Sequence, residues 1–298
     1  MDLLSIDSLS DAQIEELLDR SQLLFEDDRS DTKPVRTLAG RIVFNLFYES
    51  STRTAMSFAT ATHRLGASAL SLSVEHSSVK KGETLEDTAR TLGAMRPDAL
   101  VIRHRDNGAP ATVAEIVDAP VINAGDGTNE HPTQALLDAA TIRYRLGRIE
   151  GLKIAICGDI RHSRVARSNA KLLPRLGADV RLAGPPELMP SELPQLSVDE
   201  AIDGADVVMM LRVQRERLEE EFGDAPGEYL GRYGLTTDRL ATAAPNAVVM
   251  HPGPMNRGIE IDSGVADDRE RSLITLQVEM GVAMRMACLE MLLRETGA

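Results

Sequence analysis

Short apolar runs alternate with helical patterns through most of this 298-residue chain, and this alternation narrows its fold more than any other feature. In the first half, the apolar runs fall at 41–48, 69–74, 99–103 and 120–124, and the helical patterns at 53–65, 84–95, 111–117 and 131–146. A strand–helix repeat of this kind builds a parallel sheet with helices on both faces. The first half therefore predicts an α/β domain with a doubly wound parallel sheet.

A second series of the same kind follows. It consists of "LKIAICGD" (152–159), a helical pattern at 164–176, "DVRLAG", a helical pattern at 198–203, "DVVMMLR" and "NAVVMHPG". We place the boundary after the long helix, which gives a first domain of 1–147 and a second of 148–272. The last apolar pattern, 273–293, is long enough for one helix that packs on the first domain, so 273–298 completes that domain.

Composition excludes several classes of function. The net charge of −13 and the pI near 5.0 argue against a broad nucleic-acid or anionic-membrane surface, which needs basic patches. The two cysteines, Cys157 and Cys288, lie far apart and indicate reduced core thiols. The acidic N-terminal segment lacks the features of a signal peptide, and no apolar run reaches membrane-spanning length. We expect a cytoplasmic protein without a metal site.

The stretch "ESSTRT" (49–54) follows the first strand and opens the first helix. Free N–H groups and the positive end of the dipole at a helix N-terminus favour an anion, and the hydroxyls and guanidinium gathered here suit phosphate or carboxylate. The alternative is plain N-capping by one hydroxyl, which would need no arginine. The number of donors favours an anion site.

Polar or basic segments also follow the other strands, where ligands of open parallel sheets bind. Lys80 and Lys81 are either solvated or carried on a loop over an anion, and Arg103 is either an exposed edge residue or a ligand. His131 is either a cap or a neutral imidazole that donates to a carbonyl oxygen, with Gln134 one turn on facing the same way.

In the second half, "CGDIRHSR" lacks two glycines of the dinucleotide fingerprint, so we expect no nicotinamide cofactor. Arg164 and Arg212 lie at predicted strand ends, where two guanidiniums can bind two carboxylates; surface ion pairs with Asp159 or Glu216 are the alternative. The histidines show no metal-ligand spacing, and no Ser-His-Asp order appears. The residues indicate catalysis by positioning and charge stabilisation.

Six collinear motifs, "STRT", "KKGET", "RH", "HPTQ", "RVQRERL" and "HPGPMNRG", resemble the aspartate carbamoyltransferase catalytic chain, within the aspartate/ornithine carbamoyltransferase family. The likeness spans Ser8 to the last helix. It implies a carbamoyl-phosphate domain and an aspartate domain joined by interdomain helices. The implied substrate-binding residues are Ser51, Thr52, Arg53, Thr54, Ser77, Lys81, Arg103, His131, Gln134, Arg164, Arg212, Gln214, Gly253 and Pro254. Of these, the implied catalytic residues are Arg53, Thr54, Lys81, Arg103 and His131.

The same resemblance implies transfer of a carbamoyl group from carbamoyl phosphate to L-aspartate in pyrimidine biosynthesis, without a cofactor. It implies a homotrimer in which Ser77 and Lys81 reach the neighbouring subunit's site, with regulatory or dihydroorotase-like chains as further partners. Ornithine carbamoyltransferase differs in having His-Cys-Leu-Pro and Ser-Met-Gly motifs, whereas this chain has "HPGP" (251–254). Two alternatives stay open: another amino-acid acceptor, and a catalytically silent subunit, suggested by Ala55 and Ala59 where relatives often carry arginine and glutamate. We also expect a mobile polar loop at 219–234.

Overall fold

The computed structural model describes residues 1–29, 36–73, 81–194, 196–213 and 226–294. The elements of the first half are η1 (Ile6–Ser8), α1 (Asp11–Asp28), β1 (Ile42–Phe47), α2 (Thr52–Arg64), β2 (Ser68–Ser73), α3 (Leu85–Gly93), β3 (Ala99–His104), α4 (Ala109–Ala114), β4 (Val121–Asp126) and α5 (Pro132–Leu146). The remaining elements are β5 (Lys153–Cys157), α6 (Arg164–Arg175), β6 (Asp179–Ala183), η4 (Pro186–Leu188), α7 (Val198–Ile202), β7 (Val207–Met210), α9 (Pro226–Tyr233), α10 (Thr237–Leu240), β8 (Val248–Met250), α11 (Ser263–Ala266) and α12 (Ile274–Arg294). Each run expected to be a strand is one, with ends shifted by a few residues.

The chain divides into two compact units. One contains Met1–Ala140 and Val278–Ala298, and the other contains Thr141–Gln277. The divisions fall inside α5 and α12, whereas the sequence analysis put the boundaries at the ends of these helices. Each of the two helices therefore contributes residues to both units.

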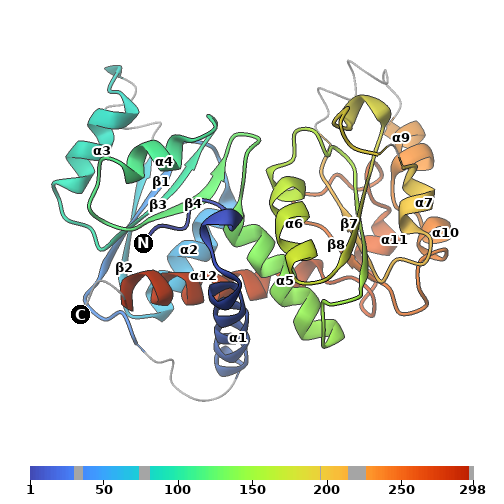
Figure 1. The fold of residues 1–298 in the computed structure, drawn as a ribbon, viewed down its shortest axis with the longest axis horizontal. Helices are drawn as coiled ribbons and strands as arrows, with labels where there is room; N and C mark the ends of the chain where they lie inside the picture. The colour runs from blue at the N-terminus through green and yellow to red at the C-terminus, as the bar shows by residue number, and fades with distance from the viewer. Residues whose placement is uncertain (30–35, 74–80, 195, 214–225, 295–298) are drawn as a thin grey trace. The chain divides into compact units, whose positions relative to one another are not determined.

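The first unit holds a parallel sheet with strand order β2-β1-β3-β4 (Figure 1). Alternate residues of each strand point to the same face, so Phe44, Leu100 and Ile102 share one face and pack against Ala89 of α3 and Val113 of α4. The connection through α2 runs along the sheet in the opposite direction to those through α3 and α4. Right-handed crossovers therefore place α2 on the other face, as a doubly wound sheet requires.

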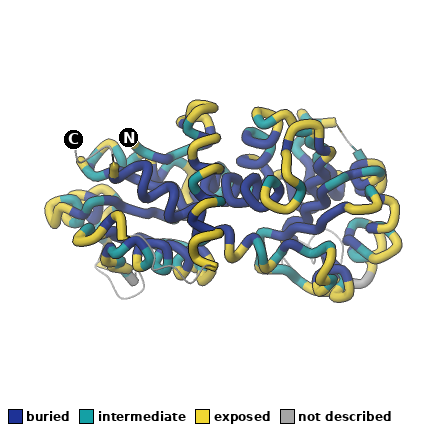
Figure 2. Tube along the Cα trace, turned by 90° about the horizontal axis from the view of Figure 1, so that it is seen from below, coloured by how far each residue is buried: buried dark blue, intermediate teal, exposed yellow. Residues whose placement is uncertain are grey.

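The second unit repeats this plan with strand order β6-β5-β7-β8, again all parallel. Cys157, Val208 and Val249 belong to one buried cluster that also contains Ala201 of α7 and Leu240 of α10. Figure 2 shows buried chain through the interior of each unit, and β3, β4, β5, β7 and β8 are buried at nearly every position, whereas the edge strands β2 and β6 are partly exposed. Strands buried on both faces read as unbroken apolar runs, which is why the sequence revealed them. The predicted fold class is confirmed.

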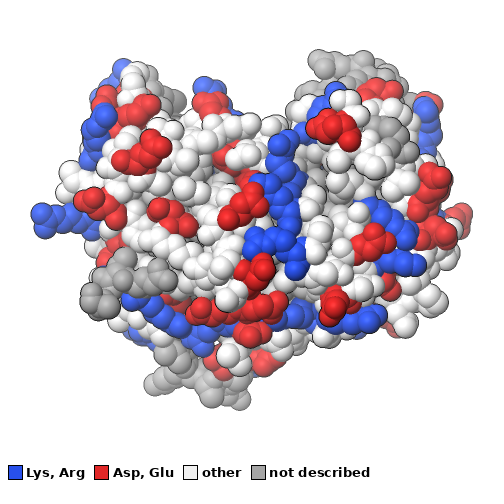
Figure 3. Space-filling model, in the orientation of Figure 1, with Lys and Arg blue, Asp and Glu red and all other residues white. Residues whose placement is uncertain are grey.

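The surface agrees with the acidic composition. On the face drawn in Figure 3, acidic and basic side chains lie side by side on each unit, and no broad basic field covers the described residues seen there. No helix among the described residues is both long and apolar enough to cross a membrane.

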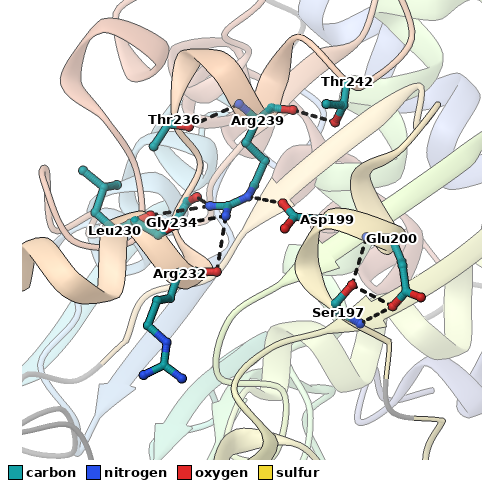
Figure 4. Close-up of polar contacts among 10 residues, drawn as sticks. Ser197, Asp199, Glu200, Leu230, Arg232, Gly234, Thr236, Arg239 and Thr242 are labelled. Atoms are coloured by element: carbon teal, nitrogen blue, oxygen red, sulfur yellow. Dashed lines mark hydrogen bonds and ion pairs between the residues drawn. The ribbon is translucent and has the colours of Figure 1, made fainter.

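The expected loop at 219–234 is wrong for its second half, because α9 occupies Pro226–Tyr233; residues 214–225 lie outside the described part. Tyr229, 2% exposed, packs with Leu188 and Ile259. Arg239 donates hydrogen bonds to the carbonyl oxygens of Gly231, Arg232 and Gly234 at the helix end, and pairs with Asp199 of α7 at 2.6 Å (Figure 4). A guanidinium at the carbonyl end satisfies orphan acceptors and opposes the helix dipole.

The expected core role of the last helix is confirmed. The methionines Met280, Met284 and Met286 of α12 are at most 4% exposed, and Cys288 is a buried free thiol. Cys157 is likewise buried in β5. Burial raises the pKa of each thiol to about 12.

Candidate active site

The strand order of each sheet locates a ligand site. In the first unit the chain order reverses between β1 and β3, and in the second between β5 and β7. Ligands of doubly wound sheets bind beyond the carboxyl ends of the strands at such a reversal. The predicted site residues lie at or beyond the ends of these strands or of their neighbours β2, β4 and β8.

Arg103 joins three strand ends of the first unit. Its Nη2 donates to Glu49 Oε1, two residues beyond β1, at 2.9 Å, and its Nη1 contacts the carbonyl oxygen of Ala124 in β4 at 3.5 Å. The Arg103 side chain is only 12% exposed. The alternative of an exposed edge arginine is therefore wrong, because the guanidinium lies within the sheet edge as a held cation.

The hydroxyls that open α2 are not used as a cap. Ser51 is the N-cap residue, but its side chain makes no capping hydrogen bond; its carbonyl oxygen accepts from the Ala55 N–H at 3.1 Å. Thr52 and Arg53 are exposed, and Thr54 is 6% exposed. The plain N-capping alternative fails for Ser51, and a helix N-terminus carrying hydroxyls and a guanidinium is suited to an anion.

The residues of "HPTQ" lie at the start of α5, beyond β4. The carbonyl oxygen of His131 accepts from the N–H groups of Gln134 and Ala135, at 2.9 and 3.3 Å, so His131 does begin the helix. His131 is 3% exposed and Gln134 is 8% exposed. The Gln134 amide donates from Nε2 to Asp138 Oδ1 at 3.0 Å. Both side chains are thus held inside the unit.

Lys81 is exposed and lies just before α3. Lys80 and Ser77 fall in 74–80, outside the described residues, as does Gln214 in 214–225. The structure therefore gives no position for Ser77 or Gln214 relative to the other predicted ligands.

A cavity of about 520 Å³ lies beside the first unit's strand ends, and its lining includes Tyr48, Glu83, Glu86, His104 and Asp106. The whole lining contains three carboxylates against one arginine, Arg105, a balance that suits an anion poorly. Burial lowers the pKa of His104, whose Nδ1 accepts from the Asp106 N–H at 3.0 Å. The start of α2 and Arg103 offer hydroxyl, guanidinium and helix N-terminal donors, which suit an anion better than this cavity does.

In the second unit, Arg164 is the first residue of α6, with Ser163 as its N-cap through the Ala166 N–H at 3.1 Å. Asp159, which we considered as a surface partner of Arg164, contacts His162 Nδ1 at 2.9 Å. This cap fixes Arg164 at the start of α6, beyond the end of β5.

Gly158 allows β5 and β7 to end close together. Its φ is +131°, and a Cβ there would lie 2.9 Å from the carbonyl oxygen of Leu211. Only glycine combines that backbone conformation with such a close approach. The exposed Arg212 follows Leu211 directly, so this contact helps to set where the guanidinium leaves the sheet.

The loop after β8 is held by a buried network. His251 Nδ1 accepts from the Gly253 N–H at 2.8 Å, so its Nε2 carries the proton and donates to Glu260 Oε1 at 3.2 Å. Glu260 Oε1 also accepts from the Asn256 N–H. Asn256 Nδ2 donates to the carbonyl oxygen of Val213 at 2.9 Å, which ties this loop to the chain beside Arg212. Gly253 and Pro254 thus lie in a loop connected to β7.

Sequence reasoning missed several of these residues. Glu49 lies within the quoted "ESSTRT" but attracted no role, and Asp138 lies four residues after Gln134, a helical spacing that brings two side chains together. Glu260 lies nine residues after His251 and four after Asn256, in a segment to which the sequence analysis gave no role. Arg285 carries no local signal, because its partner Ser57 comes from a distant part of the chain.

The arrangement can stabilise negative charge in the first unit and hold carboxylates in the second. Among the described residues no group of His, Cys, Asp and Glu is arranged to hold a metal ion. The chemistry that these side chains can supply is hydrogen-bond donation, cationic charge and positioning.

Comparison with known proteins gives consistent matches over both units. The family model for the aspartate/ornithine carbamoyltransferase carbamoyl-P binding domain matches residues 1–144, and the model for the Asp/Orn binding domain matches 150–292. The aspartate carbamoyltransferase catalytic subunit of Rhodospirillum rubrum is 55% identical over 97% of this chain and 93% of its own. The subunit of the same name from Granulibacter bethesdensis is 56% identical over 98% of this chain and 95% of its own.

Solved structures agree. The aspartate transcarbamoylase of Trypanosoma cruzi in complex with carbamoyl phosphate superposes with a TM-score of 0.87 at 33% identity, over 97% of this chain and 94% of that one. Ornithine carbamoyltransferase from Pyrococcus furiosus gives a TM-score of 0.88 at 28% identity, over 100% and 97%. With both of its parts matched by the family models and more than half of its residues identical to those of named relatives, the chain belongs to the aspartate/ornithine carbamoyltransferase family.

Proposed function

We propose that this chain is an aspartate carbamoyltransferase, which transfers the carbamoyl group of carbamoyl phosphate to the α-amine of L-aspartate. The observation that carries the proposal is the hydroxyl and arginine cluster at the start of α2, with Arg103 held at the adjacent strand ends. The relatives named aspartate carbamoyltransferase catalytic subunit support it. The products are N-carbamoyl-L-aspartate and phosphate, and the reaction serves pyrimidine biosynthesis.

The first unit binds carbamoyl phosphate in this proposal. The phosphate-binding residues are Ser51, Thr52, Arg53, Thr54 and Arg103. The carbonyl oxygen of the substrate accepts from Thr54, Arg103 and His131, while Gln134 accepts a hydrogen bond from the carbamoyl amine. These donors stabilise the oxyanion that forms when the amine attacks, and one such donor is typically worth ~10² to 10³ in rate.

The chemical step needs no protein nucleophile. The neutral α-amine forms a C–N bond to the carbamoyl carbon, and the tetrahedral intermediate then breaks its C–O bond to phosphate. The phosphate leaves with the electron pair of that bond and accepts the amine proton. Cations already around the phosphate stabilise the charge that grows on it as the bond breaks.

The second unit binds aspartate. Arg164, Arg212 and Gln214 hold its two carboxylates, and the main chain at Gly253 and Pro254 contacts the carbamoyl end. A dicarboxylate suits this set better than a diamine, because Arg212 repels a cationic side chain. No cofactor or metal ion takes part.

We further propose a homotrimer in the cytoplasm, in which Ser77 and Lys81 complete the active site of a neighbouring subunit. Regulatory or dihydroorotase-like chains are the partners proposed for a larger assembly. The two buried thiols fit a reducing compartment. Mixing Lys81→Ala chains with Arg103→Ala chains tests the shared site, because some mixed trimers would contain one intact site; mixtures that recover no activity would exclude it.

The decisive experiment is carbamoyl transfer from labelled carbamoyl phosphate with L-aspartate, with L-ornithine and without acceptor. Carbamoyl-aspartate should form far faster than carbamoyl-ornithine. Transfer to ornithine alone would assign the chain to the other activity of the family. A folded protein that binds carbamoyl phosphate but transfers it to neither acceptor would be the silent subunit considered above.

A further inference from the structure

The amide of Gln134 has a defined orientation in the structure. Its Nε2 donates to Asp138 Oδ1 at 3.0 Å, one helical turn further along α5. Asp138 is 0% exposed, and an ionised carboxylate only accepts hydrogen bonds, so it must face the NH₂ end of the amide. The amide oxygen therefore points away from Asp138. This end is the acceptor that a carbamoyl amine requires.

A buried cation accompanies this carboxylate. Arg285 of α12 is 3% exposed, and its Nη1 donates to Ser57 Oγ of α2 at 2.9 Å and to the carbonyl oxygen of Gly281 at 3.0 Å. These partners are uncharged. Burial lowers the pKa of Arg285 to about 10, and the charge of Asp138 opposes that shift.

Gly281 shows how closely the helices meet around this cation. A Cβ at Gly281 would lie 2.7 Å from Arg285 Nη1, 3.2 Å from Leu137 of α5 and 3.8 Å from Ser57 Oγ of α2. Three helices, α2, α5 and α12, therefore converge on the Arg285 guanidinium within the first unit. Two of them, α2 and α5, carry the residues assigned to carbamoyl phosphate.

We propose that Asp138 is a positioning residue that fixes the Gln134 amide with its oxygen toward the substrate, so that the site selects a carbamoyl group over an acyl group without an N–H. The inference rests on the proposed function, since it assumes that Gln134 faces the carbamoyl amine. A protonated or amide side chain at 138 could donate instead, and the Gln134 amide could then turn and present its NH₂ to the amine.

The test uses Asp138→Asn in the full-length protein and measures affinity for carbamoyl phosphate, acetyl phosphate and inorganic phosphate by calorimetry. Acetyl phosphate has a methyl group where carbamoyl phosphate has its amine. We expect the affinity for carbamoyl phosphate to fall about ten- to hundredfold, as when a buried polar group loses its partner. Affinities for acetyl phosphate and inorganic phosphate should change less than about threefold, because neither uses the amide oxygen.

A double-mutant cycle with Gln134→Met separates positioning from general damage. If Asp138 acts through Gln134, Asp138→Asn should alter selectivity by less than about twofold in the Gln134→Met background. Where Asp138→Asn alone does not fold because Arg285 is left uncompensated, the double variant Asp138→Asn with Arg285→Gln removes both buried charges and is tested in its place.

Glu290→Gln is the matched control, because Glu290 is a buried carboxylate of α12 whose hydrogen bonds join it to Arg20 and Thr37. It should leave the selectivity between carbamoyl and acetyl phosphate unchanged. Equal weakening of all three ligands by Asp138→Asn, or unchanged carbamoyl phosphate affinity, would overturn the proposal. The proposed function is tested separately, by the carbamoyl-transfer assay on the wild-type protein; a wild-type protein that does not carbamoylate aspartate would refute that function.

Discussion

Replacing Glu260 by leucine should loosen the loop that follows β8. The Glu260 side chain is fully buried, and its Oε1 accepts from His251 Nε2 and from the Asn256 N–H. Through these two bonds it holds the loop that contains Gly253, whose N–H donates to His251 Nδ1. Leucine has a similar volume but no acceptor, so both donors lose their partner.

The magnitude follows from the two donors. Each buried donor left without a partner costs about 1–3 kcal/mol, which gives about 2–6 kcal/mol for the pair. Removing the carboxylate also removes the cost of burying it, about 1–3 kcal/mol for a group with an unsatisfied oxygen. The midpoints of these two ranges, about 4 and about 2 kcal/mol, leave a net loss of about 2 kcal/mol. Glu260→Gln, the matched control, keeps an oxygen acceptor for both donors and should lose less than about 1 kcal/mol.

Urea unfolding measures the global loss, and hydrogen exchange at the Gly253 and Asn256 amides measures it locally. In Glu260→Leu, exchange at these amides should accelerate at least about tenfold, since 1.4 kcal/mol corresponds to a factor of ten. kcat/KM for aspartate should fall with it, because a misplaced binding loop costs rate. Equal stability and equal exchange in the leucine and glutamine variants would refute the assignment of Glu260 as the residue that holds this loop.

Three further predictions concern other buried groups. Burial tends to raise the pKa of Glu290, but hydrogen bonds from Arg20 and Thr37 lower it overall, so the stabilisation lost in Glu290→Gln should be full at neutral pH and should shrink as pH falls below about 4. Gly158→Ala should destabilise the protein by more than about 1 kcal/mol and weaken aspartate binding, because its Cβ would meet a backbone carbonyl at a positive φ. Cys157 and Cys288, with pKa values raised to about 12, should react with iodoacetamide at pH 8 at least about 100-fold more slowly in the folded protein than in urea.

Each prediction has its own check. Unfolding free energies of wild type and Glu290→Gln from pH 3 to 8 should converge at the acidic end, and a constant difference would contradict the ionised pair. For glycine, Gly204→Ala is the control, since its φ is also positive but no atom lies within 4 Å of the added Cβ; an equal loss would assign the whole effect to backbone strain. Rapid labelling of the folded thiols would contradict their burial.

Much of the fold could be predicted from local pattern. Strands buried on both faces are apolar at successive positions, so runs such as "IVFNLF" and "KIAIC" could be predicted to be strands from the sequence alone. The helix at Pro226–Tyr233 was missed because its sequence is polar and glycine-rich. It is stabilised by Tyr229, which packs with residues distant in sequence, and by Arg239, which bonds the carbonyl oxygens at the helix end. Tertiary packing outweighed local propensity there.

The candidate site divides in the same way. Arg103, His131 and Gln134 could be located because polar residues at strand ends stand out against the apolar runs before them. The hydrogen-bond partners of these residues could not be predicted from the sequence. Glu49 beside Arg103 needed the register of β1 and β3, and the orientation of the Gln134 amide needed the position of Asp138.

The sequence by itself determined the class of fold, the two series of strands, and the chemistry gathered at the strand ends, because periodicity and residue type are local properties. The tertiary structure alone settled that the Ser51 hydroxyl leaves the helix cap unused, that Asn256 ties the loop after β8 to Val213, and that Arg285 reaches Ser57 from 228 positions away. Such contacts depend on how distant segments pack, and the free energy of burying a charge or an unpaired donor is set by those neighbours alone.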